Sequence, residues 1–197
     1  MHLISEKDAW QIPAVIAAFL NIYLAARASI WNWFFGIIAV TLYAVIFYHA
    51  KLYGDMSLQG FYFVLQFYGY YQWKFGGAKH TELSVLHLPK KQYWIYGFAF
   101  LILFGLFYYL LSHHTNSTTP IIDAFTTALS LVAQWMMCKK YLENWVLWMI
   151  MDAISIYMYS YKQLYLTGVL YAAFFVLCVM GFRTWKAVVV SMRESIY

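Results

Sequence analysis

One predicted helical face in the second half of the chain carries side chains that suit a flat, polar solute. Trp145, Trp148 and Asp152 stand at i, i+3 and i+7, which places them on one face of a helix. Ser155 and Tyr159 continue the same face. The faces of indole rings attract flat and cationic rings, and a carboxylate pairs with a positive charge. The pattern therefore predicts a ligand-binding surface.

A second polar stripe falls on the predicted helix 56–75. It consists of Tyr62, Gln66, Tyr70 and Trp73, with Gly69 beside it. A glutamine in mid-membrane donates and accepts hydrogen bonds, either with a ligand or with a neighbouring helix at about 0.6–2 kcal/mol. Both interpretations of Gln66 stay open at this point. Asn21 and Gln134 are weaker candidates of the same kind.

Asp152 lies near the middle of its apolar segment. An Asp at that depth costs roughly 2.5–3.5 kcal/mol of insertion free energy, so such residues usually face a cavity and act there. The alternative is a structural role, either as the partner of Lys162 or as a helix-packing hydrogen bond. We favour a role in binding the solute.

These side chains belong to a chain whose composition requires a lipid environment. Of its 197 residues, 64% are hydrophobic and only 11% are charged, against roughly 25% charged in a soluble domain. A hydrocarbon core of ~30 Å takes about 20 helical residues. Seven apolar stretches suit that length, at about 10–27, 31–50, 56–75, 92–112, 121–138, 144–161 and 164–183. The predicted fold class is an all-α integral membrane protein.

The net charge of +5 does not indicate a nucleic-acid partner, because the basic residues sit in short loops between the apolar stretches. If the N-terminus is outside, the outer loops carry only Lys7, Lys51 and Lys162. The inner side then carries Arg27, Lys74, Lys79, Lys90, Lys91, Lys139, Lys140, Arg183, Lys186 and Arg193. This bias predicts an outside N-terminus and a cytoplasmic C-terminus.

An internal repeat organises the spans. Shifted by 112 residues, the segment 32–73 aligns without a gap to the segment 144–185. The matched identities include Asn32/Asn144, Trp33/Trp145, Leu52/Leu164, Tyr53/Tyr165, Gly69/Gly181 and Trp73/Trp185. Biased composition explains matches between aliphatic residues, but it does not explain Asn-Trp, Leu-Tyr, Gly and Trp all in register.

The repeat predicts a three-plus-one-plus-three topology in a single membrane domain. Residues of about 10–75 form repeat one, about 92–112 form a linking helix, and about 121–185 form repeat two. Three crossings reverse the side of the membrane and the linking helix restores it, so the two repeats run in the same direction. Parallel repeats are typical of certain transporters, in which the substrate binds near the midplane between the halves.

The two halves differ where an asymmetric solute requires them to differ. Trp148 and Asp152 align with Gly36 and Val40, so the second tryptophan and the carboxylate belong to the second half alone. This difference places the predicted binding surface on the segment 144–161.

Other classes fit less well. An intramembrane enzyme needs paired catalytic groups, and Asp152 is a lone midspan carboxylate, so we expect no enzyme. A retinal receptor needs a lysine inside the last span, which has none before Arg183. A seven-helix receptor or a channel remains an alternative, although no ring of like charges is evident. Cys138 and Cys178 lie in apolar runs without metal-ligand spacing, and we expect neither a metal nor a cofactor.

Three stretches resemble the nicotinamide riboside transporter family (PnuC). They are Asn32 to Tyr43, Gln66 to Trp73, and Lys140 to Trp148, the last being similar to the family's Trp-x-x-Trp signature. The resemblance covers essentially the whole chain, and the three-plus-one-plus-three bundle that it implies agrees with the repeat.

The resemblance implies facilitated diffusion of a vitamin-like solute, first of all nicotinamide riboside, through a homotrimer, with trapping by a cytoplasmic kinase. It also implies that Trp145 and Trp148 flank the flat ring of the substrate, while polar residues on 56–75 and 144–161 bind its sugar or amide. The predicted substrate-binding residues are Trp145, Trp148, Asp152, Gln66, Tyr70, Trp73, Tyr62 and Asn144.

The choice of vitamin stays open at the level of sequence. Positions that hold Asn in some members of the family are here Ala39, Gln66, Asp152 and Met180. Nicotinamide riboside and thiamine both contain a cationic ring, so a midplane carboxylate suits both. A thiamine or riboflavin transporter of the same fold is therefore the alternative.

Overall fold

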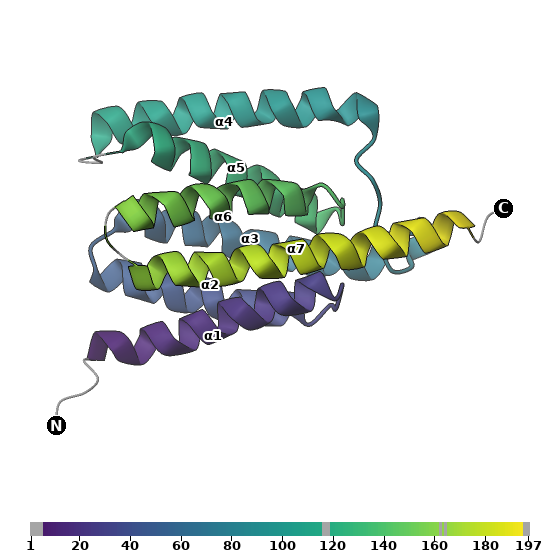
Figure 1. Ribbon diagram of the computed structural model, residues 1–197, viewed down its shortest axis with the longest axis horizontal. Helices are drawn as coiled ribbons and strands as arrows, with labels where there is room; N and C mark the ends of the chain where they lie inside the picture. The colour runs from purple at the N-terminus through teal and green to yellow at the C-terminus, as the bar shows by residue number, and fades with distance from the viewer. Residues whose placement is uncertain (1–5, 116–118, 162, 164, 195–197) are drawn as a thin grey trace. The chain divides into compact units, whose positions relative to one another are not determined.

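The computed structural model describes residues 6–115, 119–161, 163 and 165–194, and seven α-helices account for most of this range (Figure 1). The helices are α1 (Glu6–Ala26), α2 (Asn32–His49), α3 (Tyr53–Phe75), α4 (Tyr93–His114), α5 (Pro120–Cys138), α6 (Asn144–Tyr161) and α7 (Tyr165–Glu194). Two short 3-10 turns, η1 (Ala78–His80) and η2 (Lys90–Gln92), lie between α3 and α4. The all-α prediction is confirmed.

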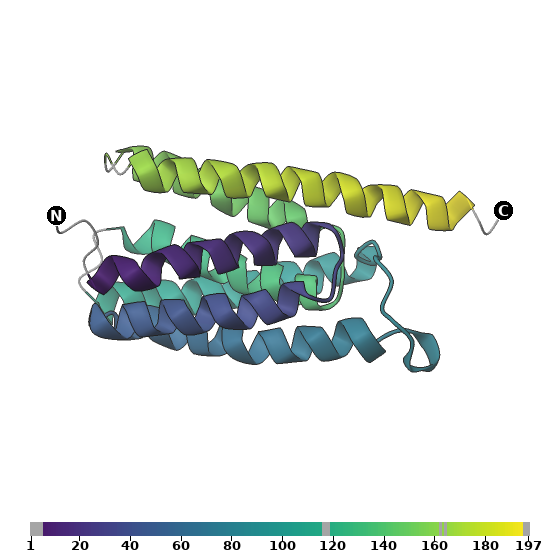
Figure 2. The same ribbon diagram turned by 90° about the horizontal axis from the view of Figure 1, so that it is seen from below.

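The chain forms two compact units. The first ends at Ser84 and contains α1–α3, and the second begins at Val85 and contains α4–α7. In the first unit α2 packs against both α1 and α3, which run alongside it (Figure 2). In the second unit α6 packs against α5 and α7, and α4 lies along α5 (Figure 1). Each predicted repeat thus has a central helix, α2 or α6.

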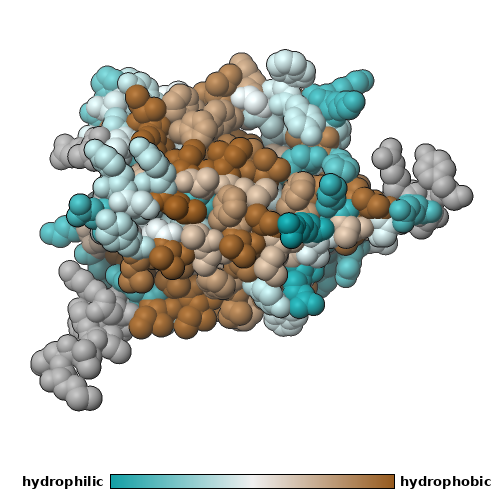
Figure 3. Space-filling model, in the orientation of Figure 1, coloured by the Kyte–Doolittle hydropathy of each residue, from teal (hydrophilic) through white to brown (hydrophobic). Residues whose placement is uncertain are grey.

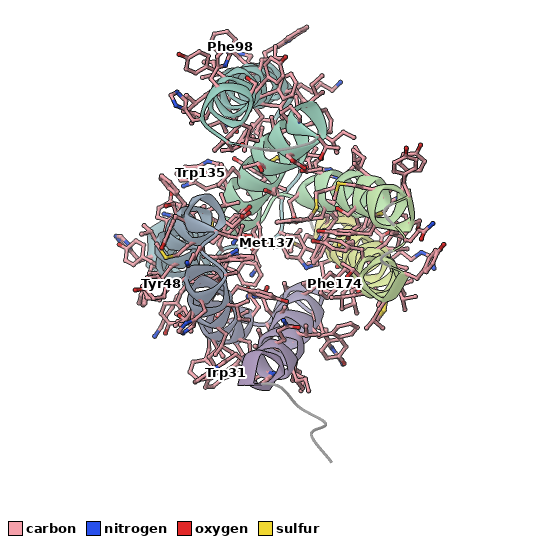
Figure 4. The ribbon with its side chains drawn as sticks, turned by 90° about the vertical axis from the view of Figure 1, so that its left-hand side faces the viewer. Trp31, Tyr48, Phe98, Trp135, Met137 and Phe174 are labelled. Carbon is pink, nitrogen blue, oxygen red and sulfur yellow. The ribbon has the colours of Figure 1, made fainter. Side chains whose placement is uncertain are left out.

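The helix surfaces are apolar where a soluble protein would be polar. Trp94 and Phe98 of α4 are 85% and 66% exposed, and Phe98 points away from α5 (Figure 4). The visible face of α1 and α7 is hydrophobic over its middle and hydrophilic toward the ends (Figure 3). Such large exposed apolar area is stable only in contact with lipid. The chain is a multi-pass membrane protein.

Four helices of the described chain, α2, α4, α5 and α7, are apolar enough to span a bilayer on length and composition alone. The other three carry the polar residues Asn21, Gln66 and Asp152, and the apolar part of α1, Trp10–Ala26, is shorter than the four spans. Polar residues inside a span lower its hydropathy and require partners in neighbouring helices. The polar side chains of α1, α3 and α6 therefore depend on contacts within their units.

The backbone repeats the 112-residue offset. α1 and α5 are followed by left-handed residues, Ala28 with φ 52° and Lys140 with φ 57°. The next turns contain a second pair, Lys51 with φ 60° and Gln163 with φ 59°. Non-glycine residues rarely adopt positive φ, so two such pairs at the same offset are independent structural support for the repeat. The limits of the repeats at about 10–75 and 121–185 stay a prediction.

A pair of tryptophans lies in the core of each repeat. Trp33 meets Trp73 edge to face, with ring centroids 5.2 Å apart and planes at 88°. At the same offset, Trp145 meets Trp185 at 5.4 Å and 86°. All four side chains are at most 1% exposed. This geometry is the favoured one for aromatic pairs, and each ring also buries a large apolar area.

A glycine makes room for each tryptophan. A Cβ added at Gly69 would overlap the ring of Trp33, and one added at Gly181 would fall 2.6 Å from ring atoms of Trp145. The central helix therefore approaches the third helix of its repeat as closely as a missing side chain allows. This explains why Gly69 and Gly181 match in the sequence repeat.

The C-terminal ends of α1, α3 and α5 carry a cation above an aromatic ring. Arg27 lies over Tyr23 at 5.8 Å, and Lys139, its counterpart in repeat two, lies over Trp135 at 5.5 Å. Lys74 lies 5.6 Å from the ring centre of Tyr70. Long cationic side chains and amphipathic rings of this kind are typical of the membrane interface.

Two segments differ from the sequence prediction. The last span was expected to end at about 183, but α7 continues to Glu194 and contains 30 residues. At ~1.5 Å per residue it is about 45 Å long, more than a hydrocarbon core requires. Its last turns carry Lys186 and continue as a helix because no Pro or Gly follows Gly181.

The segment 76–91, which the sequence leaves between two predicted spans, is not a free loop, because its second part is tied to repeat two. Leu86 donates its N–H to the carbonyl of Lys140 at 3.1 Å and accepts from the N–H of Leu142 at 2.8 Å. Glu143 accepts from the N–H of Leu88 at 2.8 Å and lies 2.9 Å from Nδ1 of His87. The segment before α4 is thereby fixed to the start of α6.

Substituting Gly181 with Ala should destabilise the protein by about 1–3 kcal/mol, because a methyl group would collide with the buried ring of Trp145. Thermal unfolding in detergent micelles measures the effect. Gly105→Ala on α4 is the matched control, since a Cβ there meets nothing within 4 Å. Equal melting temperatures for the two variants would contradict the proposed packing.

Candidate functional site

Trp145 is a packing residue in the structure. It is 1% exposed and is held between Gly181 and Trp185 of α7. Its counterpart Trp33 occupies the same position against Gly69 and Trp73. A residue that recurs in both halves cannot by itself distinguish them, and a substrate contact of Trp145 stays a prediction.

Trp148 lies one helical turn further along α6 and is only half-buried. Its counterpart in the first repeat is Gly36, where no ring is present. Repeat two therefore has an indole, that of Trp148, at a position where repeat one has no ring. Of the two predicted stacking residues, it is the one whose ring is partly accessible.

Asp152 is buried within the second unit. It is 2% exposed, and its carboxylate lies 3.4 Å from Sγ of Cys178 on α7, which donates to it. Ser155, one turn further on α6, is 4% exposed. Among the residues that the structure describes, no Lys, Arg or His side chain forms an ion pair with Asp152. Lys162, the alternative structural partner, lies outside the described residues.

A thiol is a weak donor for a carboxylate, so a cationic group would be a much stronger partner for Asp152. An unpaired buried charge is costly in a low-dielectric environment. The surroundings of Asp152 therefore favour binding of a positively charged or hydrogen-bond-donating ligand.

Three helices of the first unit place amide groups together. Gln66 of α3 is 4% exposed, and a Cβ at Gly36 of α2 would overlap its Oε1. The same added Cβ would fall 2.8 Å from Nδ2 of Asn21 on α1. Asn21 Nδ2 in turn donates to the carbonyl of Asn32 at 2.7 Å. Gly36 leaves the space in which the two amides approach each other.

The polar clusters of the two units are counterparts. Gln66 aligns with Cys178 at the 112-residue offset, and each lies against the central helix of its repeat. Sequence reasoning treated Cys178 as a small apolar side chain and missed its contact with Asp152. The alignment of Cys178 with Gln66 was the signal that could have identified it.

Four buried polar atoms of the described chain have no hydrogen-bond partner. They are Nε1 of Trp33, Nε1 of Trp145, Oε1 of Gln66 and Oδ1 of Asn144. Leaving a buried polar group unpaired costs about 1–3 kcal/mol, so such atoms require an explanation, such as a ligand or water that pairs with them. Three of the four belong to residues predicted from sequence to bind the substrate.

The predicted stripe on α3 does not stay together. Gln66 and Trp73 are buried, Tyr62 is half-buried, and Tyr70 is 41% exposed with its hydroxyl 3.3 Å from Nζ of Lys74. Trp73 belongs to the tryptophan pair of repeat one. Tyr70 lies at the edge of the stripe because four-residue steps advance by more than a full helical turn.

The described residues contain no group of three or more His, Cys, Asp or Glu side chains that could hold a metal ion. Cys138 and Cys178 are both buried, and neither forms a disulfide within the described residues. The side chains described above can recognise a ligand through an aromatic ring, a carboxylate and amide oxygens.

The fold and these side chains define a class: polytopic helical membrane proteins with polar and aromatic groups buried inside paired helical repeats. The sequence model of the nicotinamide mononucleotide transporter family matches residues 8–187. The chain belongs to this family. Membership in a transporter family confirms the expectation that the chain is not an enzyme.

Individual relatives agree with the family. The nicotinamide riboside transporter PnuC of Escherichia coli (strain K12) is 30% identical over 195 residues, covering 86% of this chain and 82% of its own. PnuC of Neisseria mucosa is 30% identical over 161 residues, covering 79% of this chain and 61% of its own.

A solved structure shows the same fold. The crystal structure of the vitamin B3 transporter PnuC superposes with a TM-score of 0.74 at 27% identity, covering 92% of this chain and 82% of that one. The predicted resemblance to PnuC is confirmed.

Proposed function

We propose that this protein carries nicotinamide riboside across the bacterial plasma membrane by facilitated diffusion. The names and the similarity of its relatives support the solute, and the buried unpaired polar atoms of Gln66, Asn144 and Trp145 support a binding site at the predicted residues. Residues with a buried, unpaired polar atom overlap with residues that the sequence predicts to bind the substrate. This overlap is the observation that carries the proposal.

The chemistry of the solute matches the groups available. Nicotinamide riboside contains a flat pyridinium cation, a carboxamide and a ribose. The half-buried indole of Trp148 offers a face for the cationic ring, and the buried carboxylate of Asp152 offers a negative charge. The free amide oxygens of Gln66 and Asn144 accept hydrogen bonds from hydroxyl or carboxamide donors.

The wider mechanism is part of the same proposal. The protein works as a homotrimer, and a cytoplasmic kinase phosphorylates the solute so that it cannot return. The N-terminus lies outside and the C-terminus in the cytoplasm. The excess of Lys and Arg on the inner loops supports this orientation, as do the cation–aromatic pairs at Arg27, Lys74 and Lys139.

Purified protein in liposomes should equilibrate labelled nicotinamide riboside without a proton or sodium gradient. Unlabelled nicotinamide riboside should compete, whereas thiamine and riboflavin should not. Liposomes without protein are the control. Uptake that required an ion gradient would exclude facilitated diffusion, and competition by thiamine alone would change the assigned vitamin.

Trp148→Ala should abolish measurable binding of nicotinamide riboside while leaving the melting temperature nearly unchanged, because the ring is half-buried and is absent from repeat one. Trp145→Ala should instead lower stability, by about 3–5 kcal/mol for loss of a buried aromatic. Trp33→Ala is the matched control for that packing loss. Calorimetric titration and thermal unfolding separate the two effects. Unchanged affinity in Trp148→Ala would eliminate stacking on this ring.

Asp152→Asn should weaken binding of nicotinamide riboside by tenfold or more, since it removes the charge and keeps the shape; tenfold corresponds to about 1.4 kcal/mol. The reduced form of the solute, in which the ring is neutral, should bind both proteins equally. Equal losses for the charged and the neutral solute would show that Asp152 acts structurally.

A further inference from the structure

The first unit carries a groove that shares only Tyr70 with the predicted substrate-binding residues. It has a volume of about 390 Å³ and is lined by Ile30, Trp31, Trp33, Phe34, Ile37, Phe67 and Tyr70. The rim is exposed: Trp31 is 62% exposed and lies at the periphery of its unit (Figure 4), and Phe34 and Phe67 are each 52% exposed. Sites for small molecules have volumes of ~300–1,000 Å³, so the groove can hold part of a ligand.

Repeat two has no equivalent of this groove's aromatic rim. The counterparts of Trp31, Phe34 and Phe67 are Glu143, Val146 and Val179. Trp31 is exposed, whereas its counterpart Glu143 accepts a hydrogen bond from the N–H of Leu88 in the segment before α4. Because the repeat folds without these rings in its second copy, packing of the repeat does not explain them.

A positive charge stands at one end of the groove. Lys74 follows Tyr70 by one helical turn, and its Nζ lies 3.3 Å from the Tyr70 hydroxyl and 5.3 Å from the ring centre of Phe75. No carboxylate forms an ion pair with Lys74 among residues 6–84. Arg27 and Lys79 lie at the same end of the unit, where the sequence offers Glu82 as an acid. This end therefore attracts anions.

We propose that the groove binds an anionic phospholipid, with one acyl chain along Phe34 and Phe67 and the phosphate on Lys74. An apolar channel that ends at a cation matches a molecule with a hydrocarbon tail and a negative head. Basic sites between helices on the cytoplasmic side are known to select anionic headgroups. The proposal is independent of the identity of the transported solute.

Two other occupants fit less well. A cationic vitamin would be repelled by the charge of Lys74. A helix from a second copy would pack on small residues that let backbones approach, and the rim of the groove is formed by large aromatic rings instead.

Native mass spectrometry of the purified full-length protein tests the proposal. The probes are phosphatidylglycerol and phosphatidylcholine with identical acyl chains. Phosphatidylglycerol should be retained in preference to phosphatidylcholine, and Lys74→Ala should reduce that preference roughly fivefold, the effect of one cation near an anionic headgroup. Equal retention of the two lipids by the unmodified protein would overturn the proposal.

Two further variants make the test specific. Lys186→Ala removes the counterpart of Lys74 in the repeat that lacks the groove, and it should leave the preference unchanged. Phe34→Ala should reduce retention of both lipids, because it opens the wall of the groove. Melting temperatures confirm that each variant is folded.

An equal loss of preference in Lys74→Ala and Lys186→Ala would show a general charge effect and reject the site. A disulfide between two copies of Phe34→Cys in membrane vesicles would show that a second protomer occupies the groove, which would also reject it.

Discussion

The fit of a tryptophan against a glycine on the neighbouring helix is the interaction on which both halves of this protein depend. It fixes the distance between α2 and α3 in one repeat and between α6 and α7 in the other. In lipid, helices gain little from hiding apolar surface, so close packing and shape complementarity must hold them together. The perpendicular ring contacts with Trp73 and Trp185 add to this packing. Once the helix pairs are fixed, the remaining side chains on their inner faces are free to serve recognition.

The differences between the halves then acquire a clear meaning. On one common framework, the first repeat places two amides around Gly36. The second repeat has an indole, Trp148, at the counterpart of Gly36 and a carboxylate, Asp152, at the counterpart of Val40. A repeated framework thus carries different polar groups in its two copies. The framework and the recognition groups can therefore vary separately during evolution.

Much of the fold was predictable because lipid imposes simple rules. Span lengths, the 112-residue offset and the glycine–tryptophan matches are visible in the sequence and recur in the structure. The length of α7 was not predictable, because hydropathy reports where a helix leaves lipid and not where it ends. The contact of Cys178 with Asp152 was missed for another reason: cysteine resembles an apolar residue until its neighbour is known. The burial of Trp145 shows the same limit, since helical periodicity assigns a face but not what covers it.

The exposure of α4 has a consequence for how the protein is made. No residue of this helix is buried within the described chain, and it is among the most apolar segments. Its partition from the translocon into lipid therefore needs no help from a folded neighbour, whereas the helices with Gln66 and Asp152 enter lipid favourably only beside their partners. Biosynthesis can thus complete the first three-helix unit, commit α4 to the membrane, and then begin the second repeat. A helix without a buried residue in this way becomes the step that separates the assembly of the two repeats in time.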